Sequence, residues 1–144
     1  MVLVDTSVWL LALRRPSRAI HALLPDVNEL RRLIELDAAA TIGPVRQELL
    51  SGIRETQQFE KLRSKLNAFP DVPIRTEDYE AAASYFNTCR AKGIQGSNTD
   101  FLVCAVAVRL GIRIYAADRD YATFATVLPI KLHKRPDGAV SSVH

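Results

Sequence analysis

The stretch that decides the fold is Val2-Leu3-Val4-Asp5-Thr6-Ser7-Val8-Trp9-Leu10. Its first three residues form a short apolar run with β-branched side chains, which is typical of a buried strand. Asp, Thr and Ser are the residues that most readily accept hydrogen bonds from the free N–H groups at the start of a helix. The stretch therefore predicts a buried strand over residues 2–4 that leads directly into a helix over residues 8–13.

Outward from this stretch, short apolar runs alternate with segments of helical spacing. This alternation predicts an α/β domain in which a short, mainly parallel sheet lies between helices, as a three-layer α/β/α arrangement. We expect further helices over residues 27–37, 44–53, 57–66, 76–92, 97–111 and 118–124. We expect further strands over residues 39–42, 72–75, 113–116 and 128–131.

Length and composition are those of one ordinary globular domain. The chain has 144 residues, of which 48% are hydrophobic and 24% are charged. We assign residues 1–131 to the domain and residues 132–144 to a C-terminal tail. No apolar run approaches the roughly 20 residues that span a bilayer, and the N-terminus lacks the basic region of a signal peptide. We therefore expect a cytoplasmic protein without membrane contact.

Cysteine and histidine show no metal-ligand pattern. Cys89 and Cys104 lie 15 positions apart and form no CxxC or CxxH motif, so we interpret them as buried free thiols in a reducing compartment. The three histidines, His21, His133 and His144, match no ligand spacing either. We interpret them as surface residues.

The cations are unevenly divided. The 19 basic residues comprise 14 Arg and 5 Lys, against 16 acidic residues, for a net charge of +3. Arginine makes forked contacts to phosphate groups, so this balance keeps nucleic acid open as a partner. The net charge alone is weak support for that interpretation.

Four acidic residues fall where ligands bind in a parallel sheet, beyond the carboxyl ends of the strands. Asp5 and Asp118 follow predicted strands. Glu48 lies one turn into the helix after the predicted strand over residues 39–42, and Asp100 lies in the first turn of the apolar helix over residues 97–111. Each has a structural alternative: Asp5 and Asp118 as helix caps, Ser97 with Asp100 as a capping box, and Glu48 as a solvated helix residue.

A cluster of these acids needs a cation. Two carboxylates about 4 Å apart repel by roughly 4 kcal/mol at an effective dielectric constant of about 20, so four cannot stay ionised without a counter-charge or shifted pKa values. Oxygen ligands without histidine or thiolate select Mg²⁺, with Mn²⁺ as a substitute.

Four segments in order resemble the PIN-domain ribonucleases, and specifically the VapC-type toxins of bacterial toxin–antitoxin pairs. They are residues 2–10, residues 43–52 (GPVRQELLSG), residues 93–105 with the run NTDFLVCA, and residues 114–122 (IYAADRDYA). Tyr121 stands where relatives often have Phe, and we expect this departure to matter little.

The resemblance implies a Mg²⁺-dependent endoribonuclease. It implies a metal site made by Asp5, Asp100 and Asp118, with Glu48 completing a catalytic set of four. Ser7 and Thr6 would orient Asp5 or a bound water. Asp120 belongs to an Asp-x-Asp pair found in many relatives, and its side chain would either support the metal ligands or lie on the surface. Either Asp118 or Glu48 would accept the proton of the attacking water.

The resemblance also implies partners. RNA is the expected substrate, with Arg14, Arg15 and Arg46 as candidate contacts, while the structural alternative for each is a solvated surface charge. A cognate antitoxin would fill the active-site groove with its C-terminal segment, and a homodimer is expected. Trp9 is interpreted as a core residue rather than a platform for a base.

Several other functions compete with this interpretation. A haloacid-dehalogenase-type phosphatase needs a second Asp where this chain has Ser7, and a receiver domain needs an acidic pair and a late lysine that are missing. A housekeeping RNA-processing nuclease of the same fold stays open. A catalytically silent binding module would be expected to have lost one or more of the four acids.

Overall fold

The computed structural model describes residues 1–13, 24–69 and 71–136. Its centre is a three-stranded parallel sheet in the order β2-β1-β3. The strands are β1 (Val2–Val4), β2 (Ala39–Ala40) and β3 (Arg113–Tyr115). In the register, Leu3 pairs with Ala40 on one side and with Ile114 on the other. The central position of β1 confirms the prediction of a buried first strand.

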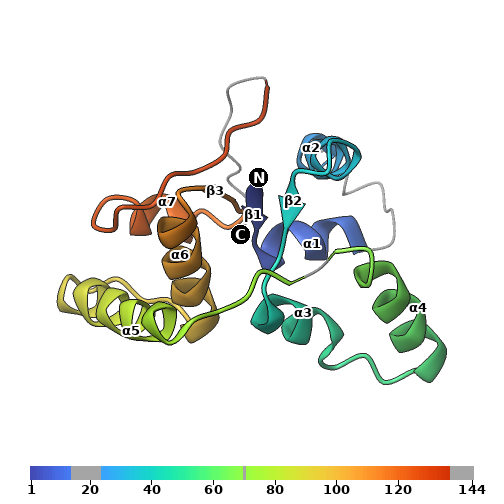
Figure 1. Cartoon of the computed structure of the whole chain (residues 1–144), viewed down its shortest axis with the longest axis horizontal. Helices are drawn as coiled ribbons and strands as arrows, with labels where there is room; N and C mark the ends of the chain where they lie inside the picture. Colours follow the sequence, from blue (N-terminus) through green and yellow to red (C-terminus); the bar gives the residue numbers. More distant parts are fainter. Residues whose placement is uncertain (14–23, 70, 137–144) are drawn as a thin grey trace.

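Helices lie on both sides of this sheet (Figure 1). The α5, α6 and α7 helices lie on one side of the three strands, and α1 to α4 lie on the other. This arrangement confirms the predicted α/β class with helices flanking a short parallel sheet. The bounds are α1 (Thr6–Leu13), α2 (Leu24–Glu35), α3 (Gly43–Leu50), α4 (Thr56–Leu66), α5 (Thr76–Ala91), α6 (Asn98–Leu110) and α7 (Asp120–Phe124).

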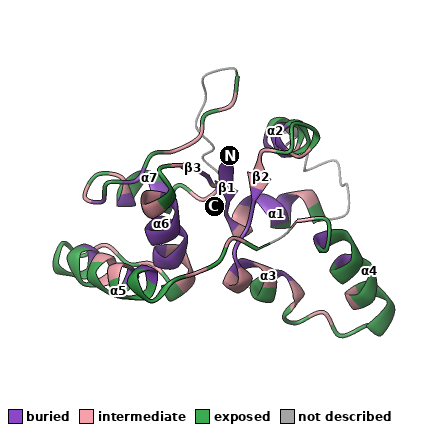
Figure 2. Ribbon diagram, viewed as in Figure 1, coloured by how far each residue is buried: buried purple, intermediate pink, exposed green. Residues whose placement is uncertain are grey.

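The core surrounds β1 and α6. All three residues of β1 are buried, and the seven consecutive residues of α6 from Phe101 to Ala107 are buried as well. Figure 2 shows this concentration of burial in the centre, while the outer sides of α4 and α5 are exposed. Gly111 ends α6 in the left-handed conformation at φ 66°, which glycine adopts without steric cost. At the start of this helix, Ser97 and Asn98 are exposed and Asp100 is half-buried, so Asp100 lies at the border of the core.

Several smaller predictions are also confirmed. Cys89 and Cys104 are free thiols, and neither is exposed. Burial raises the pKa of both thiols, so both stay protonated near neutral pH. Trp9 is a core residue, 4% exposed, with its ring 5.2 Å from the ring of Phe69.

Two predicted strands are wrong. Residues 72–75 form no strand: the segment touches the sheet through the bridge between Thr41 and Asp71 and the hydrogen bond from Val72 N to Thr41 O. Residues 128–131 form none either, and the chain instead pairs with Ile114 at Leu132. Both segments contain a proline, which has no N–H to donate to a ladder. Each is therefore limited to an isolated bridge.

The interpretation of His133 as a surface residue is also wrong. Its side chain is only 13% exposed, and its Nε2 lies 2.7 Å from Glu29 Oε2. Its ring meets the ring of Tyr115 edge to face at 5.2 Å. The first residues of the predicted tail are therefore attached to α2 and β3. His21 and His144 lie outside the described residues.

Among the helices that the structure describes, none is long and apolar enough to cross a membrane.

We predict that one ion pair stabilises the contact between α5 and α6. Arg109 Nε lies 2.8 Å from Asp78 Oδ1, Asp78 is 2% exposed, and the guanidinium also donates to the Pro73 carbonyl at 2.9 Å. Arg109→Met leaves the buried carboxylate without its cation and should lower the free energy of unfolding, measured as a lower urea concentration at the midpoint of denaturation.

The matched control is the exposed Arg63–Glu60 pair, whose side chains are 49% and 52% exposed. Arg63→Met should leave the midpoint of urea denaturation unchanged, because exposed ion pairs contribute little to stability. Equal losses in the two variants would contradict a special role for Arg109.

Candidate active site

Asp5 stands at the carboxyl end of the central strand, where the chain turns into α1. The order β2-β1-β3 means that the chain leaves β1 toward one neighbour and later returns to the other side, and such a reversal places a crevice at this end of the sheet. Asp5 is 4% exposed. Its Oδ2 accepts hydrogen bonds from Ser7 N at 3.0 Å and Ser7 Oγ at 2.7 Å. The helix start thus fixes one oxygen of this carboxylate.

Asp100 is fixed in the same way by the start of α6. Ser97 and Asp100 form the predicted capping box, in which Asp100 Oδ2 accepts from Ser97 N at 2.9 Å and Asp100 N donates to Ser97 Oγ at 3.1 Å. The capping interpretation is therefore right for Asp100, but it accounts for only one of the two carboxylate oxygens. The other oxygen faces the interior, toward Asp5.

Tyr121 joins these two carboxylates. Its hydroxyl donates to Asp5 Oδ1 at 2.8 Å and lies 3.3 Å from Asp100 Oδ1. The side chain is 1% exposed, and a buried tyrosine hydroxyl requires such a partner. Tyrosine in place of phenylalanine leaves the aromatic ring packed against Phe124, as expected, but the contact of its hydroxyl with the two acids was not foreseen from the sequence. The residue type itself could have indicated this contact, because a tyrosine hydroxyl in an apolar environment requires a hydrogen-bond partner.

Burial and proximity shift the acid–base equilibria of the pair toward protonation. Burial, together with the neighbouring charge of Asp5, raises the pKa of Asp100 from 3.8 to about 6. Burial also raises the pKa of Asp5, although hydrogen bonds from Ser7 and Tyr121 oppose the rise. Burial and both carboxylates raise the pKa of Tyr121 well above its usual value, so its hydroxyl keeps its proton. A site of this kind attracts a cation.

Ser7 connects the ends of the two adjacent strands. Its Oγ donates to Asp5 and accepts hydrogen bonds from the backbone N–H groups of Ala117 at 3.0 Å and Asp118 at 3.3 Å. The predicted hydrogen bond from Ser7 to Asp5 is therefore present. Through it, the loop after β3 is held against the end of β1.

Asp118 and Asp120 lie on that loop and at the start of α7. The α7 helix begins at Asp120, two residues later than predicted, and Asp118 precedes it. Asp118 Oδ1 accepts a hydrogen bond from Asp120 N at 2.8 Å. Asp118 is half-buried and Asp120 is exposed. Within the described residues, no three His, Cys, Asp or Glu side chains come together as a metal site. The structure thus pairs Asp5 with Asp100, and Asp118 as the third ligand stays a prediction.

Glu48 reaches the site from α3 through Thr6. Thr6 Oγ1 donates to Glu48 Oε2 at 2.9 Å, and the Glu48 side chain is exposed. Thr6 was expected to orient Asp5 or a bound water. A backbone hydrogen bond from Thr6 does act on Asp5, and its side chain holds Glu48. The hydrogen bond joins a residue that directly follows Asp5 to a carboxylate on another helix.

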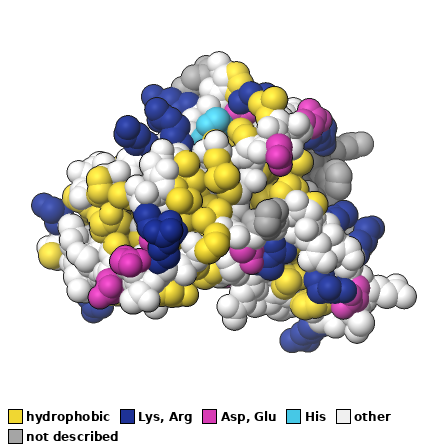
Figure 3. All heavy atoms as spheres, viewed as in Figure 1, with side chains coloured by type: hydrophobic (Ala, Val, Ile, Leu, Met, Phe, Trp, Pro, Cys, Tyr) yellow, Lys and Arg dark blue, Asp and Glu magenta, His cyan; other side chains and the backbone are white. Residues whose placement is uncertain are grey.

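Of the candidate RNA contacts, the structure describes Arg46 alone. Arg14 and Arg15 lie outside the described residues. Arg46 lies 2.9 Å from Asp71 in an ion pair and also donates to the Phe69 carbonyl, so its guanidinium already has structural partners. An RNA contact by Arg46 stays a prediction. On the face shown in Figure 3, Lys and Arg side chains are distributed around the rim rather than gathered in one patch.

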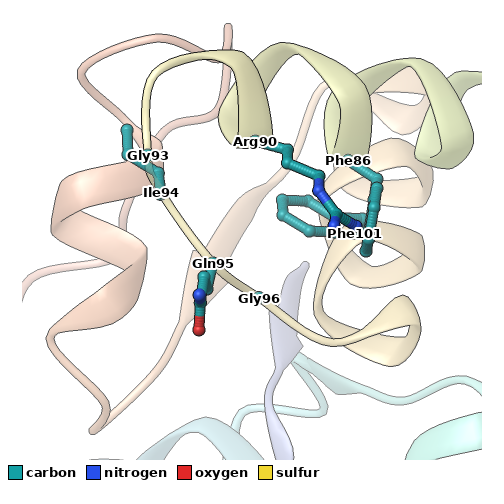
Figure 4. A pocket seen from close by; sticks show the side chains of 7 residues that line it. All are labelled: Phe86, Arg90, Gly93, Ile94, Gln95, Gly96 and Phe101. Carbon is teal, nitrogen blue, oxygen red and sulfur yellow. The ribbon is translucent and has the colours of Figure 1, made fainter.

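A hollow of about 280 Å³ lies beside the start of α6, between it and the end of α5. Figure 4 shows Arg90 and Phe86 on α5, with Phe101 behind them and Gly93 to Gly96 along the connecting loop. The Arg90 guanidinium lies 5.9 Å from the centre of the Phe86 ring. The lining includes none of the four predicted catalytic acids, so the paired carboxylates, and not this hollow, define the site.

Comparison with known proteins agrees with this geometry. The PIN domain family matches residues 2–127. VapC ribonuclease Mb1587 of Mycobacterium bovis and ribonuclease VapC11 of Mycobacterium tuberculosis are each 32% identical over 131 residues, covering 88% of this chain and 93% of theirs.

Two solved structures share the fold. FitAcB from Neisseria gonorrhoeae superposes with a TM-score of 0.70 at 18% identity, covering 92% of this chain and 97% of that one. VapBC2 from Rickettsia felis, bound to a DNA fragment from its promoter, gives 0.71 at 17% identity, covering 92% and 98%. The chain belongs to the PIN-domain family and, within it, to the VapC ribonucleases.

Proposed function

We propose that this protein is a Mg²⁺-dependent endoribonuclease, the toxin of a toxin–antitoxin pair, which hydrolyses RNA phosphodiester bonds at Asp5 and Asp100. The observation that carries the proposal is the pair formed by the buried Asp5 and the half-buried Asp100 at the carboxyl end of the central strand, bridged by one hydroxyl. Their position in a chain of the VapC family supports a nuclease over a silent binding module, since the acids are both present and assembled.

The donor atoms fit Mg²⁺. The described site offers oxygen atoms alone, from carboxylates and hydroxyls, and no histidine or thiolate takes part. Mg²⁺ typically binds one or two protein carboxylates and keeps several waters. A site with two carboxylates, and not a full set of protein ligands, agrees with this preference. Asp5 and Asp100 would hold the ion, and Asp118 is the candidate third ligand. When bound, the ion lowers the pKa of a water and offsets charge on the phosphate.

The chain's own residues provide the rest of the reaction. Ser7 holds Asp5 in one orientation, and Ser97 does the same for Asp100. Glu48, fixed by Thr6, and Asp118, beside Ser7, are the two candidates that accept a proton from the attacking water. No covalent intermediate is required, because Ser7 already donates its proton to Asp5 and is not activated by a histidine.

A protein partner is the second part of the proposal. The VapC names of the relatives, and the VapBC2 structure with its promoter DNA, support a cognate antitoxin. We propose that its C-terminal segment covers the acidic site, that the toxin is a cytoplasmic homodimer, and that RNA is the substrate. The net charge of the whole chain is +3. Because acidic residues gather at the proposed site, the remaining surface is more basic than this total indicates.

Amide substitution of the paired acids should abolish cleavage. Asp5→Asn and Asp100→Asn should each lower the rate of Mg²⁺-dependent RNA cleavage by roughly a thousandfold, measured in single turnover on a labelled RNA. The control Glu60→Gln, an exposed acid paired with Arg63, should cleave at the wild-type rate. Because Asp118 is also the candidate third ligand, Glu48→Gln and Asp118→Asn are compared at saturating Mg²⁺, and the variant that stays slow there identifies the proton acceptor. Wild-type rates in both paired-acid variants would refute the assignment.

Without metal, the carboxylate pair should make stability depend on pH. The pKa of Asp100 is about 6 in the folded protein against 3.8 ordinarily, so the folded state binds more protons than the unfolded chain between these values. Its contribution to stability therefore rises as the pH falls through 6. In urea denaturation with EDTA, wild type should gain about 1 kcal/mol relative to Asp100→Asn between pH 7 and pH 5. A difference that is constant over this range would contradict the raised pKa.

Expression in a bacterium that lacks the partner should arrest growth, and co-expression of the antitoxin should restore it. Asp5→Asn, produced at the same level, should leave growth unaffected. A protein that cleaves RNA in vitro but does not affect growth would be a housekeeping nuclease. A protein that does neither would be a binding module.

A further inference from the structure

The hydroxyl of Tyr121 occupies a particular place between the two acids. It lies 2.8 Å from Asp5 Oδ1 and 3.3 Å from Asp100 Oδ1, and the side chain is buried. Its ring packs at 5.2 Å against Phe124, which in turn packs at 5.1 Å against Phe101 on α6. The hydroxyl is therefore attached to the core that carries Asp100, and it reaches across to the strand that carries Asp5.

Each carboxylate is held at both of its oxygens. Asp5 has Ser7 at Oδ2 and Tyr121 at Oδ1, while Asp100 has Ser97 at Oδ2 and Tyr121 at Oδ1. The serines fix each acid to its own helix start, and neither serine relates one acid to the other. Tyr121 is the described group that contacts both acids, so it fixes their relative orientation and spacing.

The hydrogen bond from Tyr121 leaves one lone pair of Asp5 Oδ1 available to a cation. A carboxylate oxygen has two lone pairs, so Asp5 Oδ1 accepts the tyrosine proton with one and keeps the other. The two Oδ1 atoms, which face the same hydroxyl, are thereby presented as a pair. Groups that orient metal ligands in this way typically change metal affinity by about 10-fold to 100-fold when they are removed.

We propose that Tyr121 is a positioning residue for the cation of this site: its hydroxyl sets the geometry of the Asp5–Asp100 pair and so determines divalent-ion affinity. This inference rests on the proposed function, because it requires that the pair binds a metal. It goes beyond that function by assigning part of the affinity to a residue that itself contacts the two acids.

The experiment removes one oxygen atom and keeps the ring. Tyr121→Phe retains the aromatic packing against Phe124, so a purely structural role for the side chain predicts unchanged metal binding. The matched control is Tyr115→Phe, because Tyr115 is also 1% exposed and its hydroxyl also lies near a carboxylate, 3.0 Å from Asp26 Oδ1. Mn²⁺ is the probe, and its dissociation constant is measured by electron paramagnetic resonance of the free ion.

We expect Tyr121→Phe to weaken Mn²⁺ binding by about 10-fold to 100-fold and Tyr115→Phe to remain within about twofold of wild type. Cleavage by Tyr121→Phe should recover toward the wild-type rate when Mn²⁺ is raised to saturation. Affinity equal to or tighter than wild type in Tyr121→Phe overturns the proposal and leaves the proposed nuclease intact. Failure of wild type itself to bind Mn²⁺ overturns both.

A second measurement uses wild-type protein, and it decides the question if Tyr121→Phe does not fold. Cation binding to the pair changes the environment of the Tyr121 hydroxyl, so Mn²⁺ should shift the near-ultraviolet tyrosine absorption band. The shift should disappear in Asp5→Asn and persist in Tyr115→Phe. A flat difference spectrum for folded wild type at saturating Mn²⁺ overturns the proposal.

Discussion

The hydrogen bonding of β1 between β2 and β3 is the constraint on which the site depends. Because both neighbours run parallel to β1, the chain must leave and return by helical crossovers, and the functional ends of the strands gather at one edge. Asp5 N donates to the Tyr115 carbonyl at 2.9 Å, so the ladder continues to the acid itself. The backbone of the principal carboxylate is thus an extension of the sheet, not a free loop.

Placing two carboxylates in this interior is unfavourable, and the surrounding polar atoms offset part of the cost. Three hydrogen bonds to Asp5 and a capping box at Asp100 stabilise the charged forms, while burial opposes them. The raised pKa of Asp100 shows that the compensation is incomplete without a counter-ion. Such incomplete compensation is typical of functional sites, where the structure is built for the bound state rather than for maximum stability.

The sequence predicted much of this arrangement because strong local signals marked it. Asp5 after an apolar run and Ser97 three residues before Asp100 are motifs whose partners lie nearby in the chain. The strands at 72–75 and 128–131 were wrong because the proline in each apolar run has no N–H to donate, which limits each segment to an isolated bridge. The bridging role of Tyr121, the hold of Thr6 on Glu48 and the burial of His133 depend on contacts between residues 21 to 116 positions apart, which no local pattern encodes.

The capping box at Asp100 has an evolutionary consequence. One side chain both starts the most deeply buried helix and supplies a candidate ligand. Glutamate, which usually stands three residues after the N-cap in a capping box, would lengthen the side chain and displace the ligand oxygen. Alanine would remove both roles at once. Few substitutions of Asp100 are therefore tolerated during evolution. A substitution that removes the candidate ligand also weakens the start of α6 and with it the fold.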